Sequence, residues 1–181
     1  MTDHTIHYDT IIKLATAITE CKNPEDVALV TTESVTTAFK AKGCALFLLK
    51  KKSSELELIA SYGLSNEYLK KGPLHFMQSI EEALDAVPIA IYDVQDDPRI
   101  QYPEEARKEG ISSLLGVPIV AHGKIIGALR MYTAEPWEFD HADIAIVQAV
   151  AQICGISMDM CRVQKGYKTS IDVLKSLRAK T

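Results

Sequence analysis

The sequence has no long apolar run and no targeting signal. None of its 181 residues lies in a stretch approaching the roughly 18 consecutive apolar residues of a membrane-spanning helix. The first residues, Met1 to His4, do not open a basic segment followed by an apolar one, as a secretory signal would. Hydrophobic residues make up 47% and charged residues 24%, which is typical of a globular protein. We therefore expect a cytoplasmic protein without a membrane segment.

The sequence is also poor in motifs that carry chemistry. It has four cysteines, Cys21, Cys44, Cys154 and Cys161. They form no CxxC pair and combine with no histidine at zinc-finger spacing. HExxH, GxGxxG and P-loop motifs are missing, and Ser112 and Ser113 stand outside any nucleophile elbow. These absences predict reduced thiols, no metal site and no catalytic constellation.

Positive charge is scarce except at the C-terminal end. The net charge is −4, but residues 162–181 carry six basic side chains against Asp172 alone, a balance of +5, so the rest of the chain carries −9. An acidic body does not suit nucleic-acid binding, which needs a basic surface to neutralise phosphates. We predict no nucleic-acid partner and interpret 163–181 as a basic helical extension or linker beyond a single domain at 1–162.

What the sequence does contain is a regular order of helical and strand patterns. Apolar residues at helical spacing predict helices at 8–21 and from Asn23 to Gly43, a short helix at 79–86 and another at 103–108. Apolar runs and alternations predict strands at 44–49, 55–62, 89–92, 114–121 and 124–133. Asp140, with Asp143 three residues later, begins a long final helix. Helices flanking an antiparallel sheet make an α+β domain.

The final helix carries apolar residues in a heptad pattern. The pattern consists of Ile144, Val147, Ala151, Cys154, Met158 and Cys161. A second apolar row, from Ile146 to Met160, lies beside it, so the helix has two surfaces to cover. We predict that one row packs on the sheet and that the heptad row forms a homodimer interface. Ile171, Leu174 and Leu177 predict a separate last helical segment.

Three motifs resemble those of the GAF domain, a small-molecule sensing module related to PAS domains. They are the hairpin that ends in Ala60-Ser61-Tyr62-Gly63-Leu64, the segment Ile91-Tyr92-Asp93-Val94 followed by Asp97-Pro98-Arg99, and the hairpin Gly110-Ile111-Ser112 to Val117-Pro118-Ile119 with Gly123-Lys124-Ile125-Ile126-Gly127. The resemblance covers roughly residues 8–162. It implies a central antiparallel sheet with the first and last helices on one face and a ligand pocket on the other.

The resemblance also implies that the segments around 64–88 and 93–112 roof the pocket. The candidate ligand-binding residues are Cys44, Leu46, Tyr62, His75, Phe76, Ser79, Asp93, Arg99, Tyr102, Arg107 and Leu114. An arginine in this roof, Arg99 or Arg107, is suited to hold a carboxylate or phosphate, whereas ordinary surface ion pairs are the alternative reading.

The sequence departs from the motifs of two GAF subfamilies, and these departures narrow the range of possible ligands. The cyclic-nucleotide GAF domains carry an Asn-Lys pair and a Phe-x-x-x-Asp-Glu motif, but this chain lacks the pair and has Ile144 in place of the glutamate. Bilin-binding GAF domains attach their pigment through a cysteine commonly followed by histidine, and none of the four cysteines here is. Both ligands are disfavoured, no cofactor is predicted, and a non-covalent small molecule of unknown identity remains.

Three functions remain open at this stage. The first is a sensory module whose ligand shifts the terminal helices of a homodimer and signals to an output domain or a separate signalling protein. The second is an enzyme resembling the GAF branch that reduces free methionine sulfoxide, which would depend on the thiol of Cys44. The third is a dimerisation module without a ligand.

Overall fold

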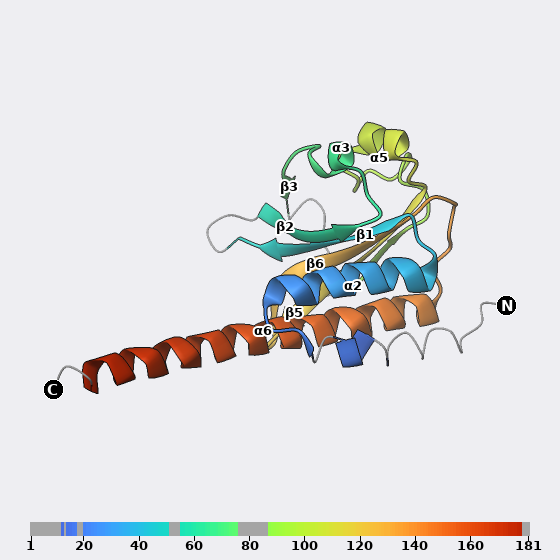
Figure 1. Cartoon of the computed structure of the whole chain (residues 1–181). Helices are drawn as coiled ribbons and strands as arrows, with labels where there is room; N and C mark the ends of the chain where they lie inside the picture. Colours follow the sequence, from blue (N-terminus) through green and yellow to red (C-terminus); the bar gives the residue numbers. More distant parts are fainter. Residues whose placement is uncertain (1–11, 13, 18–19, 51–54, 76–86, 179–181) are drawn as a thin grey trace.

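The computed structural model describes residues 12, 14–17, 20–50, 55–75 and 87–178. Six strands form one antiparallel sheet in the order β3-β2-β1-β6-β5-β4 (Figure 1). The strands are β1 (Gly43–Leu49), β2 (Glu55–Tyr62), β3 (Leu74–His75), β4 (Ile89–Ile91), β5 (Ser113–Ala121) and β6 (Lys124–Thr133). The helices are α2 (Pro24–Phe39), α3 (Asn66–Leu69), α5 (Pro103–Glu109) and α6 (His141–Arg178). The predicted α+β class and antiparallel sheet are confirmed.

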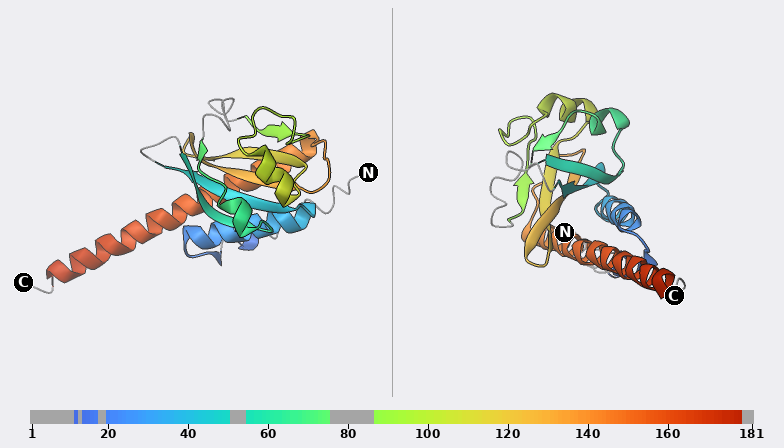
Figure 2. Two further views of the ribbon diagram at one scale, coloured as in Figure 1. Left: turned by 90° about the horizontal axis from the view of Figure 1, so that it is seen from above. Right: turned by 90° about the vertical axis from the view of Figure 1, so that its left-hand side faces the viewer.

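The sheet separates two layers. Helices α2 and α6 lie together on one face, and α3, α5 and their loops lie over the other (Figures 1 and 2). The central strands bury both of their faces: Leu46 and Leu129, paired across β1 and β6, belong to the core beneath α2 and α6, whereas Phe47 and Ala128 belong to the core on the opposite face. Successive strand residues point to opposite faces, so each central strand contributes to both cores.

Local signals set the helix ends where the sequence predicts them. The Asn23 side chain accepts a hydrogen bond from the Asp26 amide at 2.8 Å and starts α2, with Pro24 in the first turn. At the start of α6, Asp140 Oδ1 accepts from the Asp143 amide at 2.8 Å, and Asp143 Oδ2 accepts from the Asp140 amide at 3.2 Å. This reciprocal pair confirms the predicted capping box.

Most of the predicted helices and strands are confirmed, and the others fall wholly or partly on residues that the structure does not describe. The five predicted strands correspond to β1, β2, β4, β5 and β6 within one or two residues, and the predicted helices from Asn23 and at 103–108 correspond to α2 and α5. Of the predicted helix 8–21, residues 12, 14–17 and 20 are described and helical, whereas the predicted helix 79–86 lies outside the described residues. The short elements α3 and β3 were not predicted.

The last helix corrects two predictions. First, α6 is continuous from His141 to Arg178, so Ile171 and the residues after it do not form a separate segment. Second, the heptad row is not a free surface: Val147, Ala151, Cys154 and Met158 have no exposed area. Cys161 is buried and Ile144 half-buried, and all six residues pack in the core with α2 and β5. A heptad row fits a sheet and its neighbouring helix as well as it fits a second copy, and here it faces its own domain.

Close contact between α6 and the sheet requires a small residue. A Cβ atom at Gly155 would lie 2.9 Å from the Val120 carbonyl oxygen and 2.9 Å from Ile119 Cγ2. By length and composition α6 could cross a lipid bilayer, but its first half is the buried core helix of this domain, a kind of helix that passes the same test. Its second half projects away from the sheet (Figure 2).

The burial of α6 can be tested with Met158→Ala. Removing this fully buried side chain leaves a cavity between α6 and the rest of the core, so we expect the free energy of unfolding to fall by about 2–5 kcal/mol in denaturant titrations. Arg162→Ala, four residues further along and exposed, is the control and should change it by less than about 0.5 kcal/mol. Equal effects of the two substitutions would contradict the described packing.

The cysteines give a second test of the same core. Burial raises the pKa of the Cys154 thiol to about 11 and that of Cys44 further, while Cys21 is partly exposed. We expect an aromatic disulfide reagent at pH 8 to modify Cys21 in the native protein and to reach Cys44 and Cys154 only after unfolding, because the thiolate is the reactive form. Cys21→Ser should remove the fast reaction. Rapid modification of Cys44 would contradict its placement in the core.

Candidate ligand pocket

A pocket lies on the sheet face opposite α2 and α6, beneath the layer that contains α3 and α5. Its walls come from the strands β3 to β6, from the end of α3 and from the loop before α5. The lining residues are Tyr68, Lys71, Leu74, Ile89, Ile91, Arg99, Ile100, Gln101, Tyr102, Leu114, Gly116 and Arg130. The space that the centre of a water molecule can reach is about 30 Å³, enough for one or two water molecules or a group of similar size.

Two contacts between distant segments hold the roof over this pocket. The Tyr102 hydroxyl donates to the Pro73 carbonyl oxygen at 2.9 Å, which joins the loop before α5 to the segment before β3. At Gly72, which has a φ of +139°, a Cβ atom would lie 2.5 Å from that hydroxyl, so the Tyr102 ring needs a glycine here. On the other side of the roof, Glu109 at the end of α5 accepts hydrogen bonds from the Ser65 amide and hydroxyl at the start of α3.

Arg130 is the cation on the floor of the pocket. It stands in the middle of β6, opposite Ala45 in β1 and Gly116 in β5, and its side chain is only 8% exposed. Its guanidinium carbon lies 5.7 Å from the centre of the Phe47 ring, a cation–π contact. Among the described residues, no carboxylate forms an ion pair with it. The sequence interpretation missed Arg130, although it is the one charged residue inside the apolar strand from Ile125 to Tyr132.

Lys71 supplies a second cation from the roof. Its Nζ donates to the Tyr68 carbonyl oxygen at 3.2 Å and lies 3.6 Å from the centre of the Tyr68 ring. Burial, together with the positive charge of Arg130, lowers the pKa of Lys71 to about 8, while Glu109 and Glu105 on α5 act in the opposite direction. Lys71 and Arg130 line the same pocket.

Two tyrosine hydroxyls adjoin the cations. The rings of Tyr68 and Tyr132 meet edge to face with their centres 5.7 Å apart. The Tyr132 hydroxyl is buried and is the one such side-chain polar atom, among the residues that the structure describes, without a hydrogen-bond partner. Burial raises the pKa of Tyr132, and the nearby charge of Arg130 opposes this shift. Hydrogen bonding with Arg130 and Tyr68 opposes the shift as well, so this hydroxyl lies next to polar groups although no hydrogen bond of standard geometry forms there.

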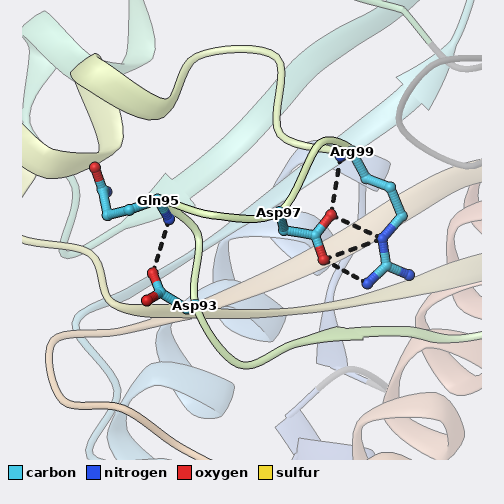
Figure 3. Close-up of polar contacts among 4 residues, drawn as sticks. All are labelled: Asp93, Gln95, Asp97 and Arg99. Atoms are coloured by element: carbon cyan, nitrogen blue, oxygen red, sulfur yellow. Dashed lines mark hydrogen bonds and ion pairs between the residues drawn. The ribbon is translucent and has the colours of Figure 1, made fainter.

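The loop after β4 is stabilised by its own carboxylates (Figure 3). Asp93 accepts a hydrogen bond from the Gln95 amide at 2.8 Å, and Asp97 accepts one from the Arg99 amide at 2.9 Å. Asp97 also binds the Arg99 guanidinium through both of its oxygens, at 2.6 to 3.2 Å, and these hydrogen bonds lower the pKa of Asp97. Asp93 and Asp97 therefore shape the loop, and Arg99 reaches the pocket wall already paired.

Only some of the predicted ligand-binding residues line the pocket. Arg99, Tyr102 and Leu114 line the pocket. Asp93 and Arg107 line a separate surface depression next to Ser112 and Pro136, and Arg107 pairs with Glu104. His75 lies in β3, while Phe76 and Ser79 fall outside the described residues.

Three of the predicted pocket residues lie elsewhere. Cys44 and Leu46 are fully buried on the opposite face of the sheet, in the core under α2 and α6, and Ala45 and Phe47 take the pocket side instead. Tyr62 is paired with Cys44, so it is on the same side of the sheet as Cys44, and it is 42% exposed. All residues of β1 from Cys44 to Leu49 are apolar, so the sequence has no alternation that shows which of them face the pocket. The prediction for Cys44 and Leu46 was wrong because the residues next to them, Ala45 and Phe47, are on the pocket side. A thiol reaction from Cys44 has no access to this pocket.

Comparison with known proteins identifies the fold independently. The GAF domain model matches residues 23–158. No relative was found among curated protein sequences. The structure is similar to the GAF domain of a phosphoenolpyruvate-protein phosphotransferase from Coxiella burnetii, with a TM-score of 0.80, 20% identity, and coverage of 91% of this chain and 99% of that one.

Two other solved structures show the same arrangement. The GAF domain of an Acinetobacter phosphoenolpyruvate-protein phosphotransferase aligns with a TM-score of 0.70 at 18% identity, covering 90% of this chain and 97% of that one. Free methionine-R-sulfoxide reductase from Neisseria meningitidis, solved with its substrate, aligns with a TM-score of 0.76 at 16% identity, covering 91% and 95%. These identities establish a shared fold alone. With its family model matched over most of its length, the chain belongs to the GAF domain family.

Proposed function

We propose that this GAF domain is a sensory module that binds a small molecule in the pocket and signals through α6 in a homodimer. One observation carries the proposal: the same strands wall the pocket on one face and support α6 on the other. In β5, Leu114 lines the pocket, and the next residue, Leu115, packs in the core with α6. A ligand that moves these strands therefore acts on the helix, provided that it binds two helix arrangements with different affinity.

The proposed dimer surface is a stripe of apolar side chains that begins near the middle of α6 and continues along its projecting half. Every residue from Arg162 to Asp172 is exposed, so no described part of the chain covers this half. Five large apolar side chains nevertheless follow one another along it, at steps of 4, 3, 4 and 4 residues and with 48–66% of their surface exposed: Ile156, Met160, Val163, Tyr167 and Ile171. This spacing places them on one side of the helix: the first four follow the 4-3-4 steps of a heptad repeat, and Ile171 lies one residue beyond the next heptad position.

The occupant of this stripe is a second copy of the same helix. A projecting helix gains little stability by itself in water, and burial of an apolar side is what normally stabilises it. Two identical stripes with heptad-like spacing are complementary to each other, as a twofold interface requires. The stripe thus takes over the role predicted for the row from Ile144 to Cys161, which is buried in the domain core.

A second candidate is a dimerisation module without a ligand. The space that water can reach in the pocket, about 30 Å³, favours it, because that volume holds only a small group. Native mass spectrometry of the purified chain, before and after mild denaturation, separates the two candidates. A small molecule released on denaturation supports the sensory module. A chain that carries none and binds none from a set of small metabolites leaves the ligand-free module.

The dimer is tested with the double substitution Met160→Glu and Tyr167→Glu. Two carboxylates per helix would have to be buried in the stripe, so we expect the wild-type chain to scatter light at tens of micromolar as twice its 20.0 kDa mass and the variant as a single chain. Lys165→Glu, on the opposite side of the helix, changes the charge without touching the stripe and should leave the dimer intact. A wild-type chain that is monomeric at this concentration refutes the proposed interface.

A further inference from the structure

We infer that the pocket binds a small organic anion, held through a carboxylate or phosphate group by Arg130 and Lys71. This inference rests on the proposed function, since it names the chemical class of the ligand for that same pocket.

Arg130 differs from the arginines of the neighbouring loops in having no acidic partner. Arg99 is bound by Asp97 and Arg107 by Glu104, whereas no described carboxylate pairs with Arg130. Removing a charged group from water is costly unless a counter-charge or hydrogen bonds replace the water. A guanidinium presents its donors as a planar fork that matches the two oxygens of a carboxylate or phosphate. An anion in the pocket is therefore the partner that Arg130 lacks.

Lys71, in the roof of the pocket, strengthens the preference for an anionic ligand. Lys71 and Arg130 both line this pocket, and Lys71 Nζ lies 3.6 Å from the centre of the Tyr68 ring. Burial lowers the pKa of Lys71, and the like charge of Arg130 lowers it further. Glu105 and Glu109 on α5 offset part of this repulsion, but Glu109 also holds Ser65 and lies near Lys42. An anion between Arg130 and Lys71 turns the repulsion between them into two attractions.

Tyr132 lies beside Arg130 on this face of the sheet. It is buried two residues further along β6, and its ring meets that of Tyr68 in the pocket wall. A tyrosine hydroxyl both donates and accepts hydrogen bonds, so Tyr132 supports the polar end of the pocket that Arg130 defines.

The rest of the pocket limits the size and nature of the ligand. Apart from the cations, the walls contain Ile89, Ile91, Leu114 and other apolar side chains, which favour a short apolar portion next to the anionic group. The space of about 30 Å³ admits a carboxylate or phosphate group, and the larger part of a nucleotide would need the roof to move. The expected ligand is thus a small metabolite with at least one anionic head and a short apolar portion.

Thermal unfolding of the full chain tests the inference with three probes: succinate, inorganic phosphate and the neutral analogue succinamide, at constant ionic strength with potassium chloride. At ten times the dissociation constant, a bound anion raises the folding equilibrium constant about 11-fold, which is about 1.4 kcal/mol and roughly 3–6 °C in Tm for a domain of this size. We expect this shift with succinate or phosphate and none with succinamide. The anion that gives the larger shift identifies the head group.

Variants then connect the effect to the two cations. Arg130→Met should weaken anion binding about 10- to 100-fold by calorimetric titration, since it removes charged hydrogen bonds. The control Arg107→Gln removes an arginine outside the pocket and should bind as the wild type does. Arg130→Lys keeps a charge and should retain part of the affinity, and Lys71→Met provides a second variant if Arg130→Met does not fold.

The inference is overturned if neither anion shifts the wild-type Tm, if succinamide shifts it equally, or if Arg130→Met and Lys71→Met bind the anions unchanged. Its failure is distinguishable from that of the sensory proposal. A neutral molecule that co-purifies with both the wild type and Arg130→Met would refute the anion while leaving a ligand-binding sensor. A chain that binds neither a co-purified molecule nor any probe would refute both.

Discussion

Burial of both faces of the central strands is the constraint on which the rest of this domain depends. Side chains alternate across β1, β5 and β6, and each strand has large apolar residues on both sides, such as Leu46 and Phe47 in β1. A sheet of this kind is stable only when both faces are covered. Helices α2 and α6 cover one face, and the layer with α3 and α5 covers the other, which leaves the pocket between that layer and the strands. The pocket and α6 are therefore joined by a single layer of backbone.

The burial of both sheet faces also explains which parts of the fold and of the site could be predicted from the sequence. Apolar runs, turn residues and helix caps were sufficient for the order of the strands and helices and for the family resemblance, because these signals are local. They could not decide which residues of β1 face the pocket, since Cys44 to Leu49 is apolar throughout. The decisive residue was on the neighbouring strand: Arg130 is paired with Ala45. A strand pairing is not local, and without it Cys44 and Leu46 were assigned to the wrong face.

Helix α6 shows a related ambiguity. Both of its apolar rows fit helical periodicity, and periodicity does not distinguish a row that packs on its own sheet from one that packs on another chain. The row that ends at Cys161 is core, whereas the stripe from Ile156 to Ile171 begins before the core row ends and continues beyond the sheet. The overlap between residues 156 and 161 means that the same two turns serve both surfaces. A displacement of α6 against β5 must therefore also displace the stripe, because a continuous helix transmits it as a rigid rod.

The buried side chain of Arg130, which has no described counter-charge, indicates how a ligand in the pocket would act on α6. Arg130 lies beneath the roof beside the Phe47 ring and without a described carboxylate partner, and departures of this kind from ordinary core composition are expected at functional sites. Two described contacts join segments of the roof to one another, Tyr102 to Pro73 and Ser65 to Glu109. An anion that draws Lys71 toward Arg130 would pull the roof and β6 together, and β6 is hydrogen-bonded to β5, against which α6 packs. On the proposed function, the difference in affinity of such an anion for two arrangements of β6 and α6 is the free energy that α6 would report.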